Sequence, residues 1–319
     1  MTSTCPTHHR RASTKRHTGP RYAGLDWPSI LRCPRLRRDA ADSVEGVNAR
    51  GVGLRGWLTS ARPAQPTIVT DPEQRRALVV EVALVLTVTL GLSGLRSLLA
   101  LVDALLAPGS LAGQSVAINA PVRKQPLLDL FYQLTGVIQL LAWAGLGGYL
   151  LWRSGIGLRA IGLHRRPAAR DIGLGAGLAA LIGGPGLGLY LLARAAGLNL
   201  TVLPSALGET WWRVPVLVAA AVANALAEEV IVVGYLITRL RQLGSGEGAA
   251  VLASAALRGS YHLYQGFGGC VGNLLMGLVF GRVWQRTHRL YPLITAHALI
   301  DTVAFVGYAL LHNHVTWLP

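Results

Sequence analysis

The sequence predicts an all-α membrane protein, a polytopic bundle of about seven transmembrane helices that follows a disordered N-terminal tail. Of its 319 residues, 51% are hydrophobic and only 14% are charged, whereas soluble domains carry about 25% charged residues. Mean hydropathy is +0.41. Apolar segments close to the roughly 20 residues that cross a bilayer as a helix recur along the chain. Together these observations favour a membrane protein over a soluble one.

Three regions follow one another. Residues 1–76 are rich in Arg, Pro, Gly, Ser and Thr without regular periodicity, which indicates a basic, disordered cytoplasmic tail or, alternatively, a lipid-headgroup-binding arm. Because the chain has only two methionines, a start further in also stays open. Residues 77–198 are expected to form three transmembrane helices and residues 199–319 a four-helix catalytic membrane core. The predicted spans are Ala77–Ala107, Leu127–Trp152, Ile172–Leu198, Val214–Leu236, Ala249–Tyr264, Gly268–Trp284 and Leu290–Leu311.

Basic residues set the expected orientation. They crowd into the tail and into every second connection, and the intervening connections hold few, which the positive-inside rule interprets as N-terminus cytoplasmic and C-terminus outside in the plasma membrane. The arginines expected inside are Arg153, Arg159, Arg165, Arg166, Arg170, Arg239, Arg241, Arg282, Arg286 and Arg289. The net charge of +15 therefore predicts a lipid bilayer as partner and no nucleic acid, because no basic face or motif supports the latter.

Ionisable residues inside three of the apolar segments are the most informative feature. Glu228 and Glu229 stand side by side in one segment, His262 in the next, and His297 with Asp301 in the last. A charged side chain in the bilayer core costs roughly 2.5–3.5 kcal/mol on insertion scales, so such residues usually mark a functional site. The alternatives without a catalytic role are a structural ion pair for the two acids and packing roles for single histidines. The tyrosines near the segment ends, Tyr261 and Tyr264, are interpreted as interfacial anchors.

Helix geometry relates these groups to one another. Adjacent residues lie about 100° apart on an α-helix, so Glu228 and Glu229 are expected to face different ways, one towards a cavity and the other towards a neighbouring helix. His297 and Asp301 are four residues apart and share a face. A carboxylate and an imidazole can activate a water molecule, and a second imidazole can stabilise an oxyanion. Hydrolysis is the chemistry that such a set suits.

The chain resembles a known family at these residues. Three segments, EEVIVVGYLITRL, YHLYQGFGG and LYPLITAHALID, are similar in type and order to the motifs of the CPBP (Abi) intramembrane proteases. That family includes the type II CAAX prenyl endopeptidases and bacteriocin self-immunity proteins. The resemblance covers about residues 215–310. It implies an intramembrane endopeptidase that cleaves a peptide or lipidated peptide.

The resemblance also implies roles for the matched residues. Glu228 would be the general base, sharing a water with His262. His297 and Asp301 would form the oxyanion side, although Asp301 could equally orient His297. Glu229 would be a second, structural acid. A divalent metal such as Zn²⁺ stays open as a cofactor, with Glu228, His262 and His297 as candidate ligands, and so does a metal-free mechanism.

Two positions depart from the family pattern. The first motif is usually E-E-x-x-x-R, and Val233 stands at the Arg position; the second is commonly F-x-x-x-H, and Arg258 stands at its first position. We hypothesise that Arg258 replaces the lost cation and pairs with Glu229, since a lone arginine in the membrane would be costly. The alternatives to an endopeptidase are a proton-coupled transporter and a catalytically silent scaffold or immunity protein.

Overall fold

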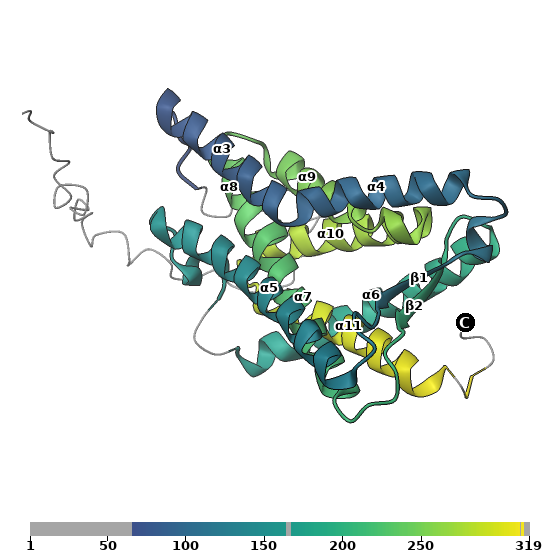
Figure 1. The fold of residues 1–319 in the computed structure, drawn as a ribbon. Coiled ribbons are helices and arrows are strands. Elements are labelled where there is room, and N and C mark those ends of the chain that lie inside the picture. Colours follow the sequence, from purple (N-terminus) through teal and green to yellow (C-terminus); the bar gives the residue numbers. More distant parts are fainter. Residues whose placement is uncertain (1–65, 164–166, 313, 316–319) are drawn as a thin grey trace, which may run out of the picture. The chain divides into compact units, whose positions relative to one another are not determined.

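The computed structural model describes residues 66–163, 167–312 and 314–315. Most of the predicted tail lies outside these residues, and the first described helix already begins at Pro72 rather than at Ala77. The helices are α3 (Pro72–Val88), α4 (Leu90–Leu106), α5 (Pro126–Arg153), α6 (Ala169–Ala195), α7 (Arg213–Glu228), α8 (Leu236–Gln242), α9 (Glu247–Ser260), α10 (Phe267–Thr287) and α11 (Tyr291–Leu311) (Figure 1). Short 3-10 turns are η1 (Leu111–Gly113), η2 (Leu158–Ile161) and η4 (Leu263–Gln265), and η3 (Glu229–Tyr235) is a π-helix.

Five helices are long and apolar enough to cross a membrane, and the pair of α3 and α4 makes a sixth if its 50° bend is counted as one span. The multi-pass membrane protein predicted from composition is thus confirmed, but the count of seven is not. Helix α9 has only 14 residues, about 21 Å at 1.5 Å per residue, whereas the hydrocarbon core is about 30 Å thick. Five or six spans leave the side of each terminus undecided, so the orientation stays a prediction.

The first predicted span is bent at Thr89, where Figure 1 shows α3 and α4 meeting at an angle. Thr89 has a non-helical backbone, with φ −117° and ψ −114°. Its hydroxyl donates to the carbonyl of Val85 at 2.6 Å. A threonine side chain that bonds back to the preceding turn competes with the backbone ladder and commonly bends a helix.

The continuous rod Arg213–Gln242, made of α7, η3 and α8, lies at the centre of the bundle. In its most apolar window 67% of the residues are buried, against 39% or less in the other four long helices. Helices α5 and α11 pack against α7, and α9 packs against α8 and η3. The outer helices expose apolar side chains such as Leu181 and Ile138, as expected for lipid-facing surfaces.

The π-helix η3 starts at Glu229, directly after the first acid. A π-helix bonds i→i+5 and so leaves carbonyls of the flanking turns without their usual partners, which is tolerated mainly at functional sites. Side chains donate to two carbonyls of η3. The hydroxyl of Ser254 donates to Val232 at 2.7 Å, and that of Thr238 donates to Gly234 at 2.6 Å. The backbone irregularity is therefore supported by its neighbours.

The described chain is mostly helical, as predicted, and a two-stranded parallel sheet is added to the helices. Strand β1 (Ser115–Asn119) pairs with β2 (Thr201–Ser205), with Ser115 opposite Thr201 and Asn119 opposite Ser205. The two strands lie in the connection before α5 and the connection before α7, and Figure 1 shows them side by side. Strands of only five residues, one of which contains a proline, give little sequence signal.

Candidate active site

Three segments bring the predicted site residues together. The end of α7 and the start of η3 supply Glu228 and Glu229, the last turn of α9 supplies Arg258, and α11 supplies His297. All four side chains are buried, with Glu229 and Arg258 at 0% exposure. The remaining two, His262 and Asp301, are half-buried at the margin of this cluster.

Arg258 joins the two acids. Its Nη2 donates to Oε1 of Glu229 at 2.7 Å, and its Nη1 donates to Oε2 of Glu228 at 3.2 Å. The guanidinium carbon also lies 5.6 Å from the centre of the Phe280 ring, within the range of a cation–π contact. Both acids thus reach one cation, although on an ideal α-helix they were expected to face different ways. The widened turn that begins at Glu229 and the length of the glutamate side chains permit this.

Glu228 has a second donor that the sequence did not indicate. The hydroxyl of Tyr261 donates to Oε2 of Glu228 at 2.6 Å. Tyr261 is 6% exposed, so its interpretation as an interfacial anchor was wrong. Its position directly before His262 is the one signal that could have drawn attention to it.

His297 lies between two carboxylates. Its Nδ1 is 2.8 Å from Oε1 of Glu229, and its Nε2 is 3.5 Å from Oδ2 of Asp301. Asn224 donates to the same oxygen of Asp301 at 3.0 Å. The groups form a continuous polar line from Arg258 through Glu229 and His297 to Asp301.

His262 makes its contact through the backbone. Its Nδ1 lies 2.9 Å from the carbonyl oxygen of Arg258. A carbonyl can only accept, so Nδ1 carries the hydrogen and Nε2 of a neutral ring is an acceptor. Within the described part of the chain, no direct hydrogen bond joins His262 and Glu228, and Oε2 of that acid accepts from Tyr261 and Arg258.

The two acids differ in their surroundings. The side chain of Glu229 is fully enclosed, and its Oε2 has no hydrogen-bond partner among the described residues. The side chain of Glu228 keeps 4% of its surface exposed. Glu228 is therefore the acid that a water molecule can reach.

The predicted metal set does not fit this geometry. Among the residues that the structure describes, no group of three or more His, Cys, Asp and Glu side chains could hold a metal ion. Both ring nitrogens of His297 face carboxylates, and the cation Arg258 already lies between Glu228 and Glu229. A ligand for Zn²⁺ must offer a free lone pair, and His297 offers none towards the other two.

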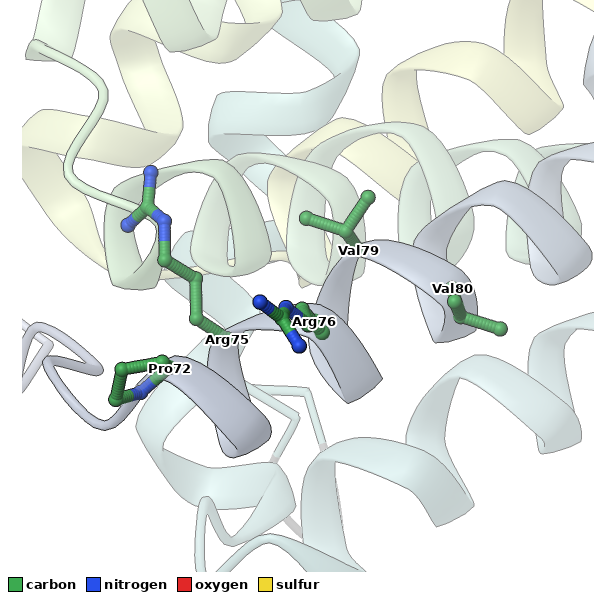
Figure 2. A pocket seen from close by; sticks show the side chains of 5 residues that line it. All are labelled: Pro72, Arg75, Arg76, Val79 and Val80. Atoms are coloured by element: carbon green, nitrogen blue, oxygen red, sulfur yellow. The ribbon is translucent and has the colours of Figure 1, made fainter.

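An open hollow of about 560 Å³ lies on α3, and Figure 2 shows its lining. It is lined by Pro72, Arg75, Arg76, Val79 and Val80. None of the predicted site residues contributes to it, so it belongs to the helix surface and not to the polar cluster.

Residues 210–303 match the family model described as Type II CAAX prenyl endopeptidase Rce1-like. This range includes every predicted site residue from Glu228 to Asp301, and the resemblance inferred from the motifs is thereby confirmed. No curated protein and no solved structure matches the chain.

Proposed function

Starting from the relationship of residues 210–303 to type II CAAX prenyl endopeptidases, we propose that this protein is an intramembrane endopeptidase. It hydrolyses a peptide bond near the end of a membrane-embedded or lipid-linked peptide. The observation that carries the proposal is the pair of unlike acids held by one buried arginine, of which only Glu228 keeps an exposed surface. A purely structural ion pair has no need of a second acid with an unpartnered oxygen.

In the proposed mechanism Glu228 is the general base. Its carboxylate takes one proton from a water molecule that Nε2 of His262 also contacts, and the oxygen of that water bonds to the carbonyl carbon of the substrate. The tetrahedral intermediate then collapses, the C–N bond breaks, and Glu228 returns the proton to the leaving nitrogen. Residues in such roles typically contribute 10²–10⁴-fold each.

The oxyanion side is assigned to His297 and Asp301. A carboxylate cannot donate a hydrogen bond, so the donor is the Nε2–H of His297, and Asp301, held by Asn224, orients the ring. Nε2 of His297 lies 3.5 Å from Asp301, which is long for a hydrogen bond, so a substrate oxygen can replace Asp301 as the acceptor of that N–H. Preorganised donors of this kind are usually the largest catalytic contribution.

Arg258 and Glu229 position the other groups. Val233 is fully buried and apolar, so the position that usually holds an arginine in the family supplies no cation here. Arg258 supplies that cation instead. The guanidinium holds Oε2 of Glu228, while Glu229 holds Nδ1 of His297. We place the catalytic core in residues 199–319 of a plasma-membrane protein whose N-terminus is cytoplasmic and whose C-terminus is outside.

A turnover assay tests the proposal. The purified protein in lipid nanodiscs is given a quenched fluorogenic peptide that ends in a farnesylated Cys-aliphatic-aliphatic-X sequence. Glu228→Ala should lower kcat by about 10²–10⁴-fold, and the exposed Glu73→Ala should not. Full activity of Glu228→Ala would remove the proposal, and peptide-driven proton uptake into liposomes without cleavage would indicate a carrier instead. Because no step needs a metal, chelator should leave the rate unchanged.

A further inference from the structure

The two outer edges of the β1–β2 sheet differ. Successive residues of a strand direct their N–H and C=O groups to opposite sides. The N–H of Thr201 donates to the carbonyl of Gln114, towards β1, while the N–H of Val202 donates to the hydroxyl of Tyr190, away from β1. Pro204 lies two residues after Val202 and offers no N–H to that outer side. The outer edge of β2 is therefore already closed.

The outer edge of β1 is open by the same register. With Ser115 opposite Thr201 and Ala117 opposite Leu203, residues 115 and 117 direct their N–H and C=O groups away from β2. The sheet has only two strands in the part of the chain that the structure describes, and no described hydrogen bond uses these groups. Ser115 is exposed, and Ala117 is half-buried. Unpaired donors and acceptors along an edge are a template for another strand.

The sheet is tied to the candidate site through the segment after His262. Immediately before β2, the N–H of Leu200 donates to Gln265, and the N–H of Phe267 donates to Leu198. These bonds fix the turn that begins at His262. The side chain of Val116 on β1 packs into the same apolar cluster as Leu263.

A second contact ties the sheet to the other side of the site. Ile118 of β1 packs into the cluster that contains Phe305 of α11 and Leu217 of α7. Those are the helices that carry His297 and Glu228. Strand β1 therefore packs into two apolar clusters that also contain side chains from α7, α11 and η4.

We propose that the outer edge of β1, at Ser115–Ala117, binds the peptide substrate as an added strand. This rests on the proposed endopeptidase function, which supplies the peptide. A substrate must be extended to expose its scissile bond, and an extended backbone has no internal hydrogen bonds. Where the membrane excludes water, each unsatisfied backbone group is costly. An open strand edge supplies these bonds whatever the side chains are, as in strand addition elsewhere.

Ala117→Pro tests the edge from the protein side. It removes an outward N–H and fills the edge, yet it leaves the β1–β2 ladder intact, since proline is tolerated where the N–H points outward. The KM for the farnesylated fluorogenic peptide should rise by about five- to tenfold, as expected for the loss of one or two hydrogen bonds, with kcat within about twofold. Ala120→Pro makes the same chemical change in an exposed residue beyond the paired register, and it should leave KM unchanged.

The substrate side needs no protein variant. A series of substrate peptides is each methylated on one backbone nitrogen. KM should rise for every second peptide of the series, because only alternate residues of the substrate face the edge of β1. If Ala117→Pro fails to fold, the methylation series still tests whether the substrate binds as an added strand. Cleavage with no alternation overturns the added strand and leaves the endopeptidase standing.

A crosslinking arm separates the two proposals. The Glu228→Gln variant is exposed to the same peptide carrying a photoreactive diazirine, and the attachment site is mapped by mass spectrometry. Attachment within residues 114–118 supports the edge even if the wild-type protein cleaves nothing, in which case only the endopeptidase is removed. Attachment elsewhere overturns the edge, and neither attachment nor cleavage overturns both.

Discussion

Arg239 on α8 and Arg258 on α9 are both buried in the bundle, at 1% and 0% exposure, but their partners differ. The Arg239 cluster contains one acid, Glu81, which is 2.8 Å away and keeps 28% of its side chain exposed. The other partners of Arg239 are neutral oxygens, contributed by Ser154, Gln242 and Leu150. One positive charge thus meets one negative charge, and water still reaches the acid.

The Arg258 cluster contains more negative charge than one arginine neutralises. Glu228 and Glu229 both contact the guanidinium, and one oxygen of Glu229 has no hydrogen-bond partner among the described residues. Tyr261 and His297 donate or lie close to these acids. Nε of each arginine also lacks a hydrogen-bond partner among the described residues, so the excess of acids is what separates the two clusters. The comparison supports a structural role for the Arg239 cluster, which joins α3, α5 and α8, and the proposed catalytic role for the Arg258 cluster.

The largest expected effect follows from removal of the central cation. Arg258→Met leaves two enclosed carboxylates without a counter-charge, and breaking a buried pair in this way typically lowers the free energy of unfolding by about 3–5 kcal/mol. We expect a large fall in Tm in detergent and loss of peptide cleavage. Glu229→Gln in the same chain removes one of the stranded charges, so it should restore part of the Tm. Wild-type stability and activity of Arg258→Met would contradict the pairing.

Arg239→Met sharpens the comparison because it removes an equally buried arginine from the other cluster. Glu81 is partly exposed and can be hydrated instead, so the free energy of unfolding should fall by only about 2 kcal/mol. The fraction that remains folded should cleave peptide at the wild-type kcat. A specific loss of kcat, after correction for folded protein by size-exclusion chromatography, would mean that the Arg239 cluster also serves the reaction.

Tyr261→Phe tests the second donor to Glu228 with a change of one oxygen atom. A hydrogen bond to a charged group is worth about 1.5–3 kcal/mol, and its loss leaves the base less firmly oriented. We expect kcat to fall by about tenfold or more, with little change in KM. The matched control is Tyr264→Phe, because the hydroxyl of Tyr264 contacts Gln265 and not an acid. Equal effects of the two variants would argue for a general packing role.

The sequence predicted the ionisable residues of the site better than their geometry. Long apolar segments predicted the long helices. Glu228, His262 and His297 were selected as candidates because ionisable residues are rare in such segments. Tyr261 did not stand out, since a tyrosine near a segment end is equally suited to a membrane interface. The π-helix after Glu228 was not predicted either, because hydropathy and residue spacing do not distinguish one π-helical turn from an α-helix.

The error at α9 has a similar origin. Hydropathy measures how apolar a stretch is, and one face of the apolar helix α9 is buried by protein. Ala250, Ala255 and Arg258 of α9 are all 0% exposed, so this helix contacts its neighbours and not lipid on that face. A window of hydropathy does not separate the two environments. Only the contacts of the folded bundle do so.

Glycine spacing in the sequence also fails to distinguish buried from open positions. The substitution of these glycines gives the smallest expected effect on stability and activity. Gly277 and Gly177 each belong to a pair of glycines four residues apart, a pattern typical of close helix packing. A Cβ at Gly277 would lie 2.8 Å from the Cα of Ala255 in α9, whereas a Cβ at Gly177 would meet nothing within 4 Å. Contact with α11 is made by Gly175 instead, where a Cβ would lie 2.5 Å from Thr295.

Gly277→Ala should therefore lower the free energy of unfolding by about 1–2 kcal/mol, because backbone in α9 must shift to admit the methyl group. Gly177→Ala should be neutral or stabilise by up to about 1 kcal/mol, since alanine favours an open helical position. Thermal unfolding in one detergent compares the two. Because the Cδ of Arg258 lies 3.3 Å from the same added Cβ, Gly277→Ala should also lower kcat, and Gly177→Ala should not. Equal Tm and kcat for both variants would show that the distance between α9 and α10 does not set the position of Arg258.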